Sequence, residues 1–354
     1  MNKNAFSILG VFILCFSCNE SNLHKINYHS LKGDIISDSI FSRMPGDLYV
    51  LKNHIVWHDP FDSEGFTHYI DKHTKKEIVA IGNIGQGPNE FQTPDLSQTY
   101  DNNILIYDLN SDKQAILITD SVVNKKQDYF VFIESNNINN INTITRKKNI
   151  HNNTFVTLEP KSEDGIFRLL LHDKSFNFGE FFMGNAIENA FSVYQGHIGY
   201  NNDNNIFVYA NNCVSYISIY KLDEQNRSFS LLNEIIEDYN YNRINNKNLT
   251  INKEKRGCMG LALSKDFIIL QKRDYKSDNT NENEVNPNSF DKLPRTVFLY
   301  DYKGNLKHIV NLEVPILRIA ANIQNNELYI ISVNPEYFIM KYDLDTLFTD
   351  NLKT

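Results

Sequence analysis

The densest group of residues that could do chemistry lies between positions 54 and 68. It combines histidines, acidic residues and the single tryptophan of the chain: His54, Trp57, His58, Asp59, Asp62, Glu64 and His68. A metal site would need three or four of these side chains to converge on one ion. In an extended strand His54 and His58 point to the same side but lie about 13 Å apart, which is too far to share an ion. We therefore expect no metal site, but a solvated loop in which Trp57 offers a flat face to a sugar or a peptide.

The strand pattern described below predicts a ring of small sheets around a central channel. Three arginines are predicted to lie just before or within the strands that line this channel: Arg43, Arg256 and Arg318. Arg318 is the most informative of them, because it lies in the apolar segment 316–320, where a charge needs a partner. A ligand in the channel or an ion pair between neighbouring sheets would supply that partner, and the sequence leaves both open. Tyr194 and His197 precede another expected inner strand and are predicted to face the same channel.

The sequence contains no motif for a serine nucleophile of the Gly-x-Ser-x-Gly type and no His-Glu-x-x-His zinc motif. An enzyme that uses two carboxylates stays open, because such carboxylates converge from distant loops. An enzyme should bring two or more carboxylates, or a histidine, within hydrogen-bond reach in the channel. A binding protein should show an aromatic-lined groove without clustered titratable groups. We expect a binding protein without a cofactor, with an enzyme as the alternative.

The composition favours a globular β-protein and argues against nucleic acid as a partner. Of the 354 residues, 41% are hydrophobic and 22% are charged, which is enough apolar material for a packed core. The 35 Lys and Arg against 43 Asp and Glu give a net charge of -8, whereas nucleic-acid binding needs a basic surface. The 19 Tyr and 23 Phe, together with Asn-rich turns, favour strands over helices.

The first 17 residues have the features of a signal peptide. Lys3 supplies a positive charge, and an apolar run from Ala5 to Ser17 follows it. This run is too short to span a bilayer, which takes about 20 residues. The segment Leu14-Cys15-Phe16-Ser17-Cys18 resembles the lipobox of bacterial lipoproteins, in which the cysteine after a small residue becomes lipidated. The resemblance implies that Cys18 carries a lipid anchor, and that this anchor is the only contact with the membrane.

Two further cysteines, Cys213 and Cys258, would remain as thiols if Cys18 is lipidated. Their separation of 45 residues does not say whether they are close enough for a disulfide. Two buried free thiols are the favoured interpretation, because cysteine packs as a small hydrophobic residue. After removal of residues 1–17 no Cys-x-x-Cys pair remains, so a structural zinc site is not supported.

The rest of the chain repeats one pattern of a strand, a polar turn and a second strand. Short runs of β-branched and aromatic residues, bounded by Asn, Asp and Gly, recur without a sustained helical period. The pattern occurs in six places: 48–81, 104–118, 154–173, 206–221, 267–305 and 327–343. Six units over roughly 300 residues give about 50 residues each, the size of a four-stranded propeller blade. A β-sandwich or a β-helix is the competing interpretation, but neither calls for six similar hairpins.

Three stretches interrupt this pattern and are predicted to be polar loops: 121–150, 223–256 and 276–294. Within the second of them, residues 230–236 have a composition that suits either an outer strand or a short helix. Periodicity alone does not separate these two alternatives.

A glycine-rich segment lies between the first two units. It is not a phosphate loop, because Glu90 stands where a dinucleotide fingerprint has its third glycine. A tight connector explains it better, with Gly85 and Gly87 supplying unusual backbone angles and Pro88 stiffening the exit. Together with Phe91 these residues match the signature Gly-x-Gly-Pro-x-Glu-Phe. The segment resembles the six-bladed propeller lipoproteins of Bacteroidetes, which are grouped with TolB-like and NHL-like propellers.

We therefore predict an all-β protein, a six-bladed β-propeller of four-stranded antiparallel blades. The expected organisation is a signal peptide at 1–17, a lipidated segment with a ring-closing strand at 18–36, and the propeller at 37–354. The resemblance implies an outer-membrane lipoprotein on the periplasmic or the cell-surface face. The expected function is non-catalytic binding or scaffolding of a carbohydrate or an envelope protein at the channel mouth. A glycan hydrolase or lyase with a site at that mouth is the alternative.

Overall fold

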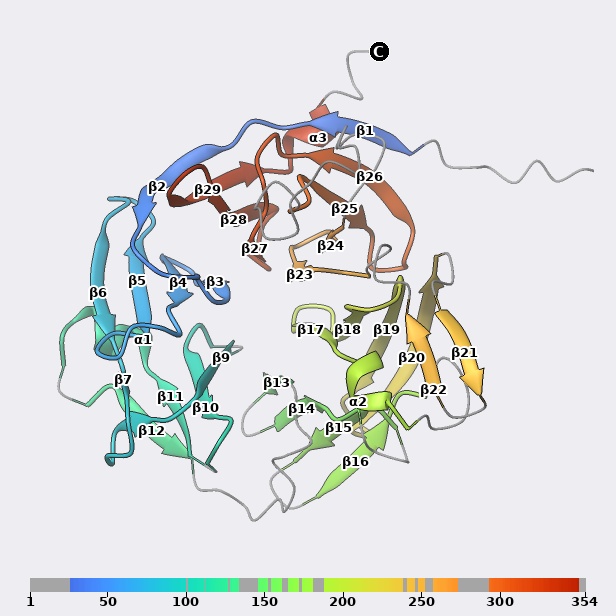
Figure 1. Ribbon diagram of the computed structural model, residues 1–354, viewed down its shortest axis with the longest axis horizontal. Coiled ribbons are helices and arrows are strands. Elements are labelled where there is room, and N and C mark those ends of the chain that lie inside the picture. The colour runs from blue at the N-terminus through green and yellow to red at the C-terminus, as the bar shows by residue number, and fades with distance from the viewer. Residues whose placement is uncertain are drawn as a thin grey trace, which may run out of the picture.

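Strands that are apolar on both faces need a neighbour on each side, and this chain provides the neighbours by closing six sheets into a ring (Figure 1). The prediction of an all-β, six-bladed propeller is confirmed. The computed structural model describes residues 26–349 apart from 100, 112, 127, 134–145, 152–153, 161–164, 172–173, 181–187, 238–240, 246–247, 252–256 and 273–292. The expected signal peptide, Cys18 and Arg256 lie outside the described residues.

Each blade runs from an inner strand at the channel to an outer strand at the rim. Blade 1 consists of β3 (Leu48–Val50), β4 (His54–His58), β5 (Thr67–Asp71) and β6 (Glu77–Ile81). Blade 2 consists of β9 (Pro94–Gln98), β10 (Ile104–Asp108), β11 (Gln114–Leu117) and β12 (Phe130–Ile133). Blade 3 consists of β13 (Arg146–His151), β14 (Thr154–Leu158), β15 (Phe167–Leu170) and β16 (Ser175–Phe178).

The second half of the ring repeats this order. Blade 4 consists of β17 (Gly196–Asn201), β18 (Ile206–Asn211), β19 (Tyr216–Asp223) and β20 (Ser228–Ile236). Blade 5 consists of β23 (Gly260–Leu263), β24 (Ile268–Gln271), β25 (Thr296–Tyr300) and β26 (Leu306–Asn311). Blade 6 contains β27 (Arg318–Ala321), β28 (Glu327–Val333) and β29 (Tyr337–Asp343). The segment 230–236 is therefore part of an outer strand.

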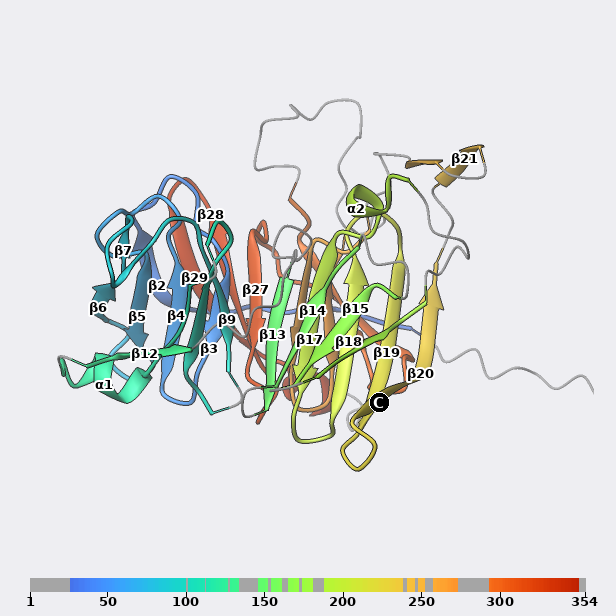
Figure 2. The same cartoon turned by 90° about the horizontal axis from the view of Figure 1, so that it is seen from below.

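The remaining elements are short. They are the parallel pair β7 (Asn83–Ile84) and β8 (Glu90–Phe91), the hairpin β21 (Tyr241–Asn245) and β22 (Asn248–Ile251), and the helices α1 (Thr119–Val123), α2 (Ala190–Val193) and α3 (Thr346–Thr349). Helix α2 and the β21–β22 hairpin lie on the same face of the ring (Figure 2). Within the described part of the chain, no helix is long and apolar enough to cross a membrane.

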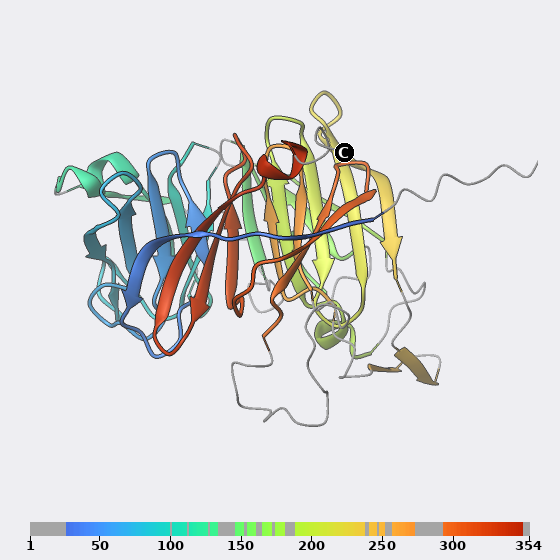
Figure 3. The ribbon, with the colours of Figure 1, turned by 90° about the horizontal axis from the view of Figure 1, so that it is seen from above.

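The N-terminal strands join the two ends of the chain. Strand β2 (Asp34–Ile40) pairs antiparallel with β29 and is the outer strand of blade 6, so this blade combines the first strands of the chain with the last ones. Strand β1 (Asn27–Ser30) pairs parallel with β26 and adds a fifth strand to blade 5. Figure 3 shows the segment from β1 to β2 crossing the outer edge of these two blades.

The expectation that 121–150 is a polar loop was wrong. This stretch contains the end of α1, the outer strand β12 and the first part of the inner strand β13. Strand β13 escaped notice because it begins Arg146-Lys147-Lys148, a charged sequence that is typical of loops. Its polar character reflects its place at the channel. The segment 223–256 likewise contains strands β20, β21 and β22.

Blades are held together by hydrophobic clusters between their faces. At the contact of blades 3 and 4, the ring centroid of Phe167 lies 5.1 Å from both Phe207 and Tyr209. All five residues of β10 and of β25 are buried, which explains why these strands are continuous apolar runs and do not alternate. Neither Cys213 nor Cys258 forms a disulfide with another described residue: Cys258 is buried in such a cluster, whereas Cys213 is half-buried.

Ring closure by β2 can be tested with two neighbouring isoleucines. Ile36 is 7% exposed and packs in the cluster between blades 6 and 1, whereas Ile35 is 53% exposed. We expect Ile36→Ala to lower the free energy of unfolding by about 2–5 kcal/mol, because it removes buried methylenes. Ile35→Ala is the matched control and should change it by less than about 0.5 kcal/mol. Chemical denaturation measures both, and equal losses would contradict the role of β2 in closing the ring.

Candidate functional site

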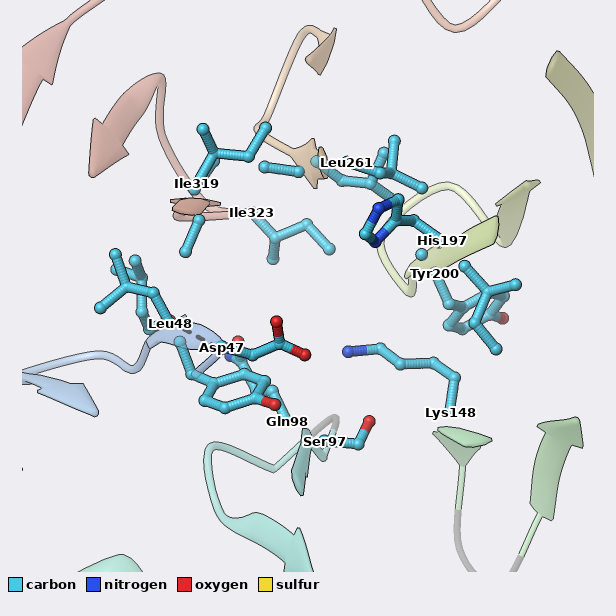
Figure 4. A pocket seen from close by; sticks show the side chains of 18 of the residues that line it. Asp47, Leu48, Ser97, Gln98, Lys148, His197, Tyr200, Leu261, Ile319 and Ile323 are labelled. Carbon is cyan, nitrogen blue, oxygen red and sulfur yellow. Dashed lines mark hydrogen bonds between the residues drawn. The ribbon is translucent and has the colours of Figure 1, made fainter. Parts of the chain in front are cut away.

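The channel contains a cavity of about 200 Å³. Residues of all six inner strands line it, so each blade contributes to one shared site (Figure 4). Every blade is wound in the same sense from the inner strand outward, and the first residues of the inner strands therefore meet at one end of the channel. The charged groups of the site come mainly from these positions.

A carboxylate between two guanidinium groups connects three blades. Asp47 directly precedes β3, while Arg146 and Arg318 are the first residues of β13 and β27. Arg146 Nη1 donates a hydrogen bond to Asp47 Oδ2 at 3.0 Å, and Arg318 Nε lies 3.8 Å from Asp47 Oδ1. Burial alone would raise the pKa of Asp47, but Arg146 and Arg318 outweigh it and hold this pKa below its usual value. Asp47 is therefore ionised at neutral pH.

A second carboxylate, Asp95, lies behind the wall of the cavity. Its Oδ2 accepts a hydrogen bond from Tyr107 and lies 3.8 Å from Arg146 Nη1, and its Oδ1 accepts the backbone N–H of Leu96 at 3.0 Å. Burial raises the pKa of Asp95, and Arg146 partly offsets this effect. Asp95 is not among the residues that line the cavity, so both of its oxygens serve the protein rather than a ligand.

Two nitrogen-containing side chains complete the site. Burial, with Arg146 as the next cause, lowers the pKa of His197 to about 4, so this imidazole is neutral at pH 7. Burial lowers the pKa of Lys148 to about 8, so its ammonium is still mostly charged at pH 7. Among the residues that the structure describes, Lys148 has no hydrogen-bond or ion-pair partner. Figure 4 shows it pointing into the cavity toward the side that carries Asp47.

The structure brings together only part of the residues expected at the channel. Arg318 and His197 line the cavity. Arg43 is exposed in a loop and does not line the cavity. Its backbone oxygen accepts a hydrogen bond from the Tyr337 hydroxyl. The expectation for Tyr194 was wrong: its side chain is 0% exposed and packs between blades 3 and 4, because it follows α2 and precedes the inner strand.

The expected ligand surface around residues 54–68 was also wrong. Trp57 is 1% exposed, and its ring stacks on His68 at 4.0 Å between centroids. His58 is buried as well, and this burial lowers its pKa to about 4. The physical reason is that β4 is the second strand of blade 1, so both of its faces are covered by neighbouring blades. The aromatic ring is part of the core and offers no face to a ligand.

The polar residues of this cluster have structural partners. His68 Nδ1 donates to Glu77 Oε2 at 3.2 Å, and Asp59 and Asp62 each accept the backbone N–H of the residue two positions later, at 2.9 Å. His54 begins β4 and is half-buried, whereas Glu64 is exposed in the loop. Within the described ranges there is no group of three or more His, Cys, Asp or Glu that could hold a metal ion.

The Gly-x-Gly-Pro-x-Glu-Phe segment forms a closed loop around a carboxylate. Glu90 Oε2 accepts the backbone N–H of Gly87 at 2.8 Å, and Gly85 packs against the same carboxylate so closely that an added Cβ would overlap it. Phe91 is buried between blades 1 and 2. The expectation of unusual backbone angles was wrong, because neither glycine has a positive φ. The glycines are needed for space, and Pro88 is exposed at the tip.

Several residues of the site were not singled out from the sequence: Asp47, Asp95, Arg146 and Lys148. A usable signal was present for Asp47, since it directly precedes a strand that was expected. Asp95 offered none, because the strand Pro94–Gln98 was not expected from the sequence. Arg146 and Lys148 share one face of β13 because they are two residues apart. They could have been found only once β13 was recognised as an inner strand.

Comparisons with known proteins identify no family for this chain. No family model and no curated protein matches the chain. Regucalcin, a calcium-binding protein from Agrobacterium tumefaciens, is 12% identical over 89% of this chain and 95% of that one, with a TM-score of 0.49. A luciferin-regenerating enzyme is 10% identical over 85% and 92%, with a TM-score of 0.49. The β-propeller domain of Myceliophteria thermophila Cps50 (Swd1) is 8% identical over 86% and 98%, with a TM-score of 0.44. Likenesses of this degree assign neither a family nor a function to the chain.

The glycine loop can be tested with a double-mutant cycle. Gly85→Ala should lower the free energy of unfolding by about 1 kcal/mol, because the new methyl group displaces the Glu90 carboxylate from the Gly87 N–H. In a Glu90→Ala background the same substitution should cost less than about 0.5 kcal/mol, since no carboxylate remains to be displaced. Denaturant titration of the four proteins measures the coupling. Additive costs would show that Glu90 is not the reason for the glycine.

Proposed function

We propose that this protein is a non-catalytic binding protein of the cell envelope that holds part of a carbohydrate inside the propeller channel. The observation that carries the proposal is the cavity of about 200 Å³, to which all six blades contribute. Concave sites with a few convergent polar groups are the usual places for small ligands. Most of the wall is formed by the inner strands, and loops that follow them, such as the one with Ile323, complete it.

The dimensions of the cavity favour a carbohydrate over a protein partner. Sites for drug-sized ligands enclose roughly 300–1,000 Å³, so this smaller cavity suits a group of about one sugar ring and excludes a folded domain. Three tyrosines, Tyr49, Tyr107 and Tyr200, contribute to its lining beside the apolar side chains Ile319 and Leu261. Such mixed walls suit a sugar, which has apolar faces and polar edges. An envelope protein would have to bind at the rim of the ring.

The proposed location depends on the N-terminal sequence. A signal peptide at 1–17 and the lipobox-like segment ending at Cys18 support export and a lipid anchor at the outer membrane. Strand β1 begins at Asn27, so only 8 residues, numbers 19–26, separate Cys18 from the first strand of the ring. If Cys18 is lipidated, this short connection keeps the ring close to the membrane surface, since it spans at most about 30 Å when extended.

A glycan hydrolase or lyase is the second candidate, and one observation favours it. Two carboxylates, Asp47 and Asp95, do meet at Arg146, as a carboxylate-based enzyme would require. Asp47 is held ionised by two arginines, however, and Asp95 lies behind the cavity wall with both oxygens engaged. A general acid must be protonated and must reach the ligand. Neither carboxylate meets both conditions. The channel does gather titratable groups as an enzyme would, since His197 lines it together with Asp47. The proposal of binding without catalysis therefore rests on the lack of a carboxylate that is both protonated and able to reach the ligand.

The binding proposal predicts that neutral and acidic sugars stabilise the protein and that filling the cavity abolishes this effect. A ligand that binds the folded state raises the midpoint of thermal unfolding by mass action. Ile323 points into the cavity, and Ile323→Trp should obstruct the space and remove the shift. Leu109→Trp, at an exposed position of blade 2, is the matched control and should keep it. A thermal-shift screen with a monosaccharide panel decides this; a shift that survives Ile323→Trp places the ligand elsewhere.

The enzyme alternative makes a different prediction. If the protein only binds, incubation with soluble polysaccharides should release no new reducing ends and form no unsaturated uronate that absorbs near 235 nm. Both signals can be followed over hours at several pH values. Product formed by the native protein and lost in Asp95→Asn would overturn the binding proposal, because it would require the carboxylate that binding does not use.

A further inference from the structure

We propose that the ligand of the channel carries a carboxylate and that Lys148 binds it, which makes the ligand an acidic carbohydrate such as a uronic acid. This inference rests on the proposed function and names the ligand class of the same site. Three observations support it: the charge balance of the cavity wall, the engagement of every other cation there, and the position of the Lys148 side chain.

The wall of the cavity has the opposite charge balance to the whole chain. The protein has a net charge of -8. The cavity, in contrast, is lined by four basic residues, Arg146, Lys147, Lys148 and Arg318, and by one acidic residue, Asp47. A concave site with low-dielectric walls concentrates this positive potential. Such a site attracts an anion and disfavours a cation.

Three of the four cations already have partners in the protein. Arg146 and Arg318 both contact Asp47, and Arg318 Nη1 also donates to the backbone oxygen of Leu317 at 3.0 Å. Lys147 donates to Gln114 Oε1, and its ammonium lies 4.3 Å from the ring centroid of Phe155. These contacts fix the three side chains in the wall. The two guanidinium groups keep N–H donors that these contacts do not use, but both already share their charge with Asp47, and Lys147 already has a partner in Gln114.

Lys148 is the exception. No ion pair or hydrogen bond to another described residue occupies its ammonium, which points into the cavity across from Asp47 (Figure 4). Asp47 already has two guanidinium partners, so it does not need Lys148 for its own neutralisation. A half-buried ammonium without a partner is costly, and an incoming carboxylate would provide the missing acceptor. The Ser97 hydroxyl also points into this cavity and can donate to the same ligand.

The anion could belong to a sugar or be free phosphate, since both present oxygen acceptors to an ammonium. The cavity favours a sugar, because it is larger than one phosphate needs and because tyrosines and apolar side chains form part of its wall. The experiment therefore compares three probes on the purified protein: uronic acids (glucuronate, galacturonate and mannuronate), their neutral parent sugars, and inorganic phosphate.

Isothermal titration calorimetry should show that at least one uronic acid binds about ten- to a hundredfold more tightly than its neutral parent at pH 7, the range expected for a charged hydrogen bond. Lys148→Met should abolish this preference, because it keeps the length of the side chain and removes the charge. Lys148→Arg should retain it. Lys126→Met, at an exposed position after α1, is the matched control and should bind as the native protein does.

The preference should also depend on pH. Lys148 has a pKa of about 8, so its charge is present below pH 8 and lost above it, and the affinity for the uronic acid should fall as pH rises through about 8 to 9. In Lys148→Arg this fall should disappear, because a guanidinium stays charged. Lys147 titrates over the same range, and Lys148→Arg separates the two. The other charged or titratable groups around the cavity are Asp47, Tyr49, Tyr107, Arg146, His197, Tyr200 and Arg318.

The outcomes separate this inference from the proposed function. If no sugar binds, the proposed function fails. If neutral and acidic sugars bind equally and Lys148→Met changes neither, the carboxylate site is overturned while binding in the channel stands. Phosphate that binds as tightly as the best uronic acid and competes with it would overturn the sugar as the source of the anion. If Lys148→Met does not fold, the pH profiles of the native protein and of Lys148→Arg still decide, because a flat native profile contradicts the role of Lys148.

Discussion

The whole structure depends on the closure of the ring by β2. Each blade is buried on both faces only if the next blade covers it, so an open ring would leave two large apolar faces in water. The pairing of β2 with β29 prevents this by building blade 6 from both ends of the chain. The same pairing positions the site, because the chain leaves β2 at Ile40 and reaches Asp47 only 7 residues later. The strand that closes the ring and the first charged residue of the channel, Asp47, are therefore close together in the sequence.

The uniform winding of the blades has an electrostatic consequence. It gathers the starts of the six inner strands, so charges that are far apart in sequence meet around one small space. Asp47 and Arg318, which belong to neighbouring blades at the seam of the ring, are 271 positions apart. Their contact, together with that of Arg146, joins blades 1, 3 and 6 across the channel. Part of the polar content of the inner strands thus stabilises the ring, and only the remainder is available to a ligand.

The sequence was sufficient to predict the fold but not to predict most residues of the site. Continuous apolar runs such as 104–107 and 296–300, separated by Asn and Asp turns, predicted blades because both faces of such strands must be buried. Arg318 was found because a charge within an apolar run needs a partner. Arg146 and Lys148 were missed because an inner strand that faces a polar channel has the composition of a loop. Trp57 was wrongly predicted to be exposed for the opposite reason. Its polar neighbours in sequence suggested a solvated loop, whereas its strand lies in the core.

In the proposed site the basic residues have different roles, and this difference is the reason that the proposal assigns the ligand class to a single lysine. Without Asp47, Arg146 would keep Asp95 and Arg318 would keep the backbone oxygen of Leu317, but the channel would hold a larger uncompensated positive charge. Asp47 neutralises part of this potential and fixes both guanidinium groups in the wall. The Lys148 ammonium then remains without a partner among the described residues. The proposed ligand with one carboxylate suits that arrangement, because Lys148 is the basic side chain of the lining that has no partner among the described residues.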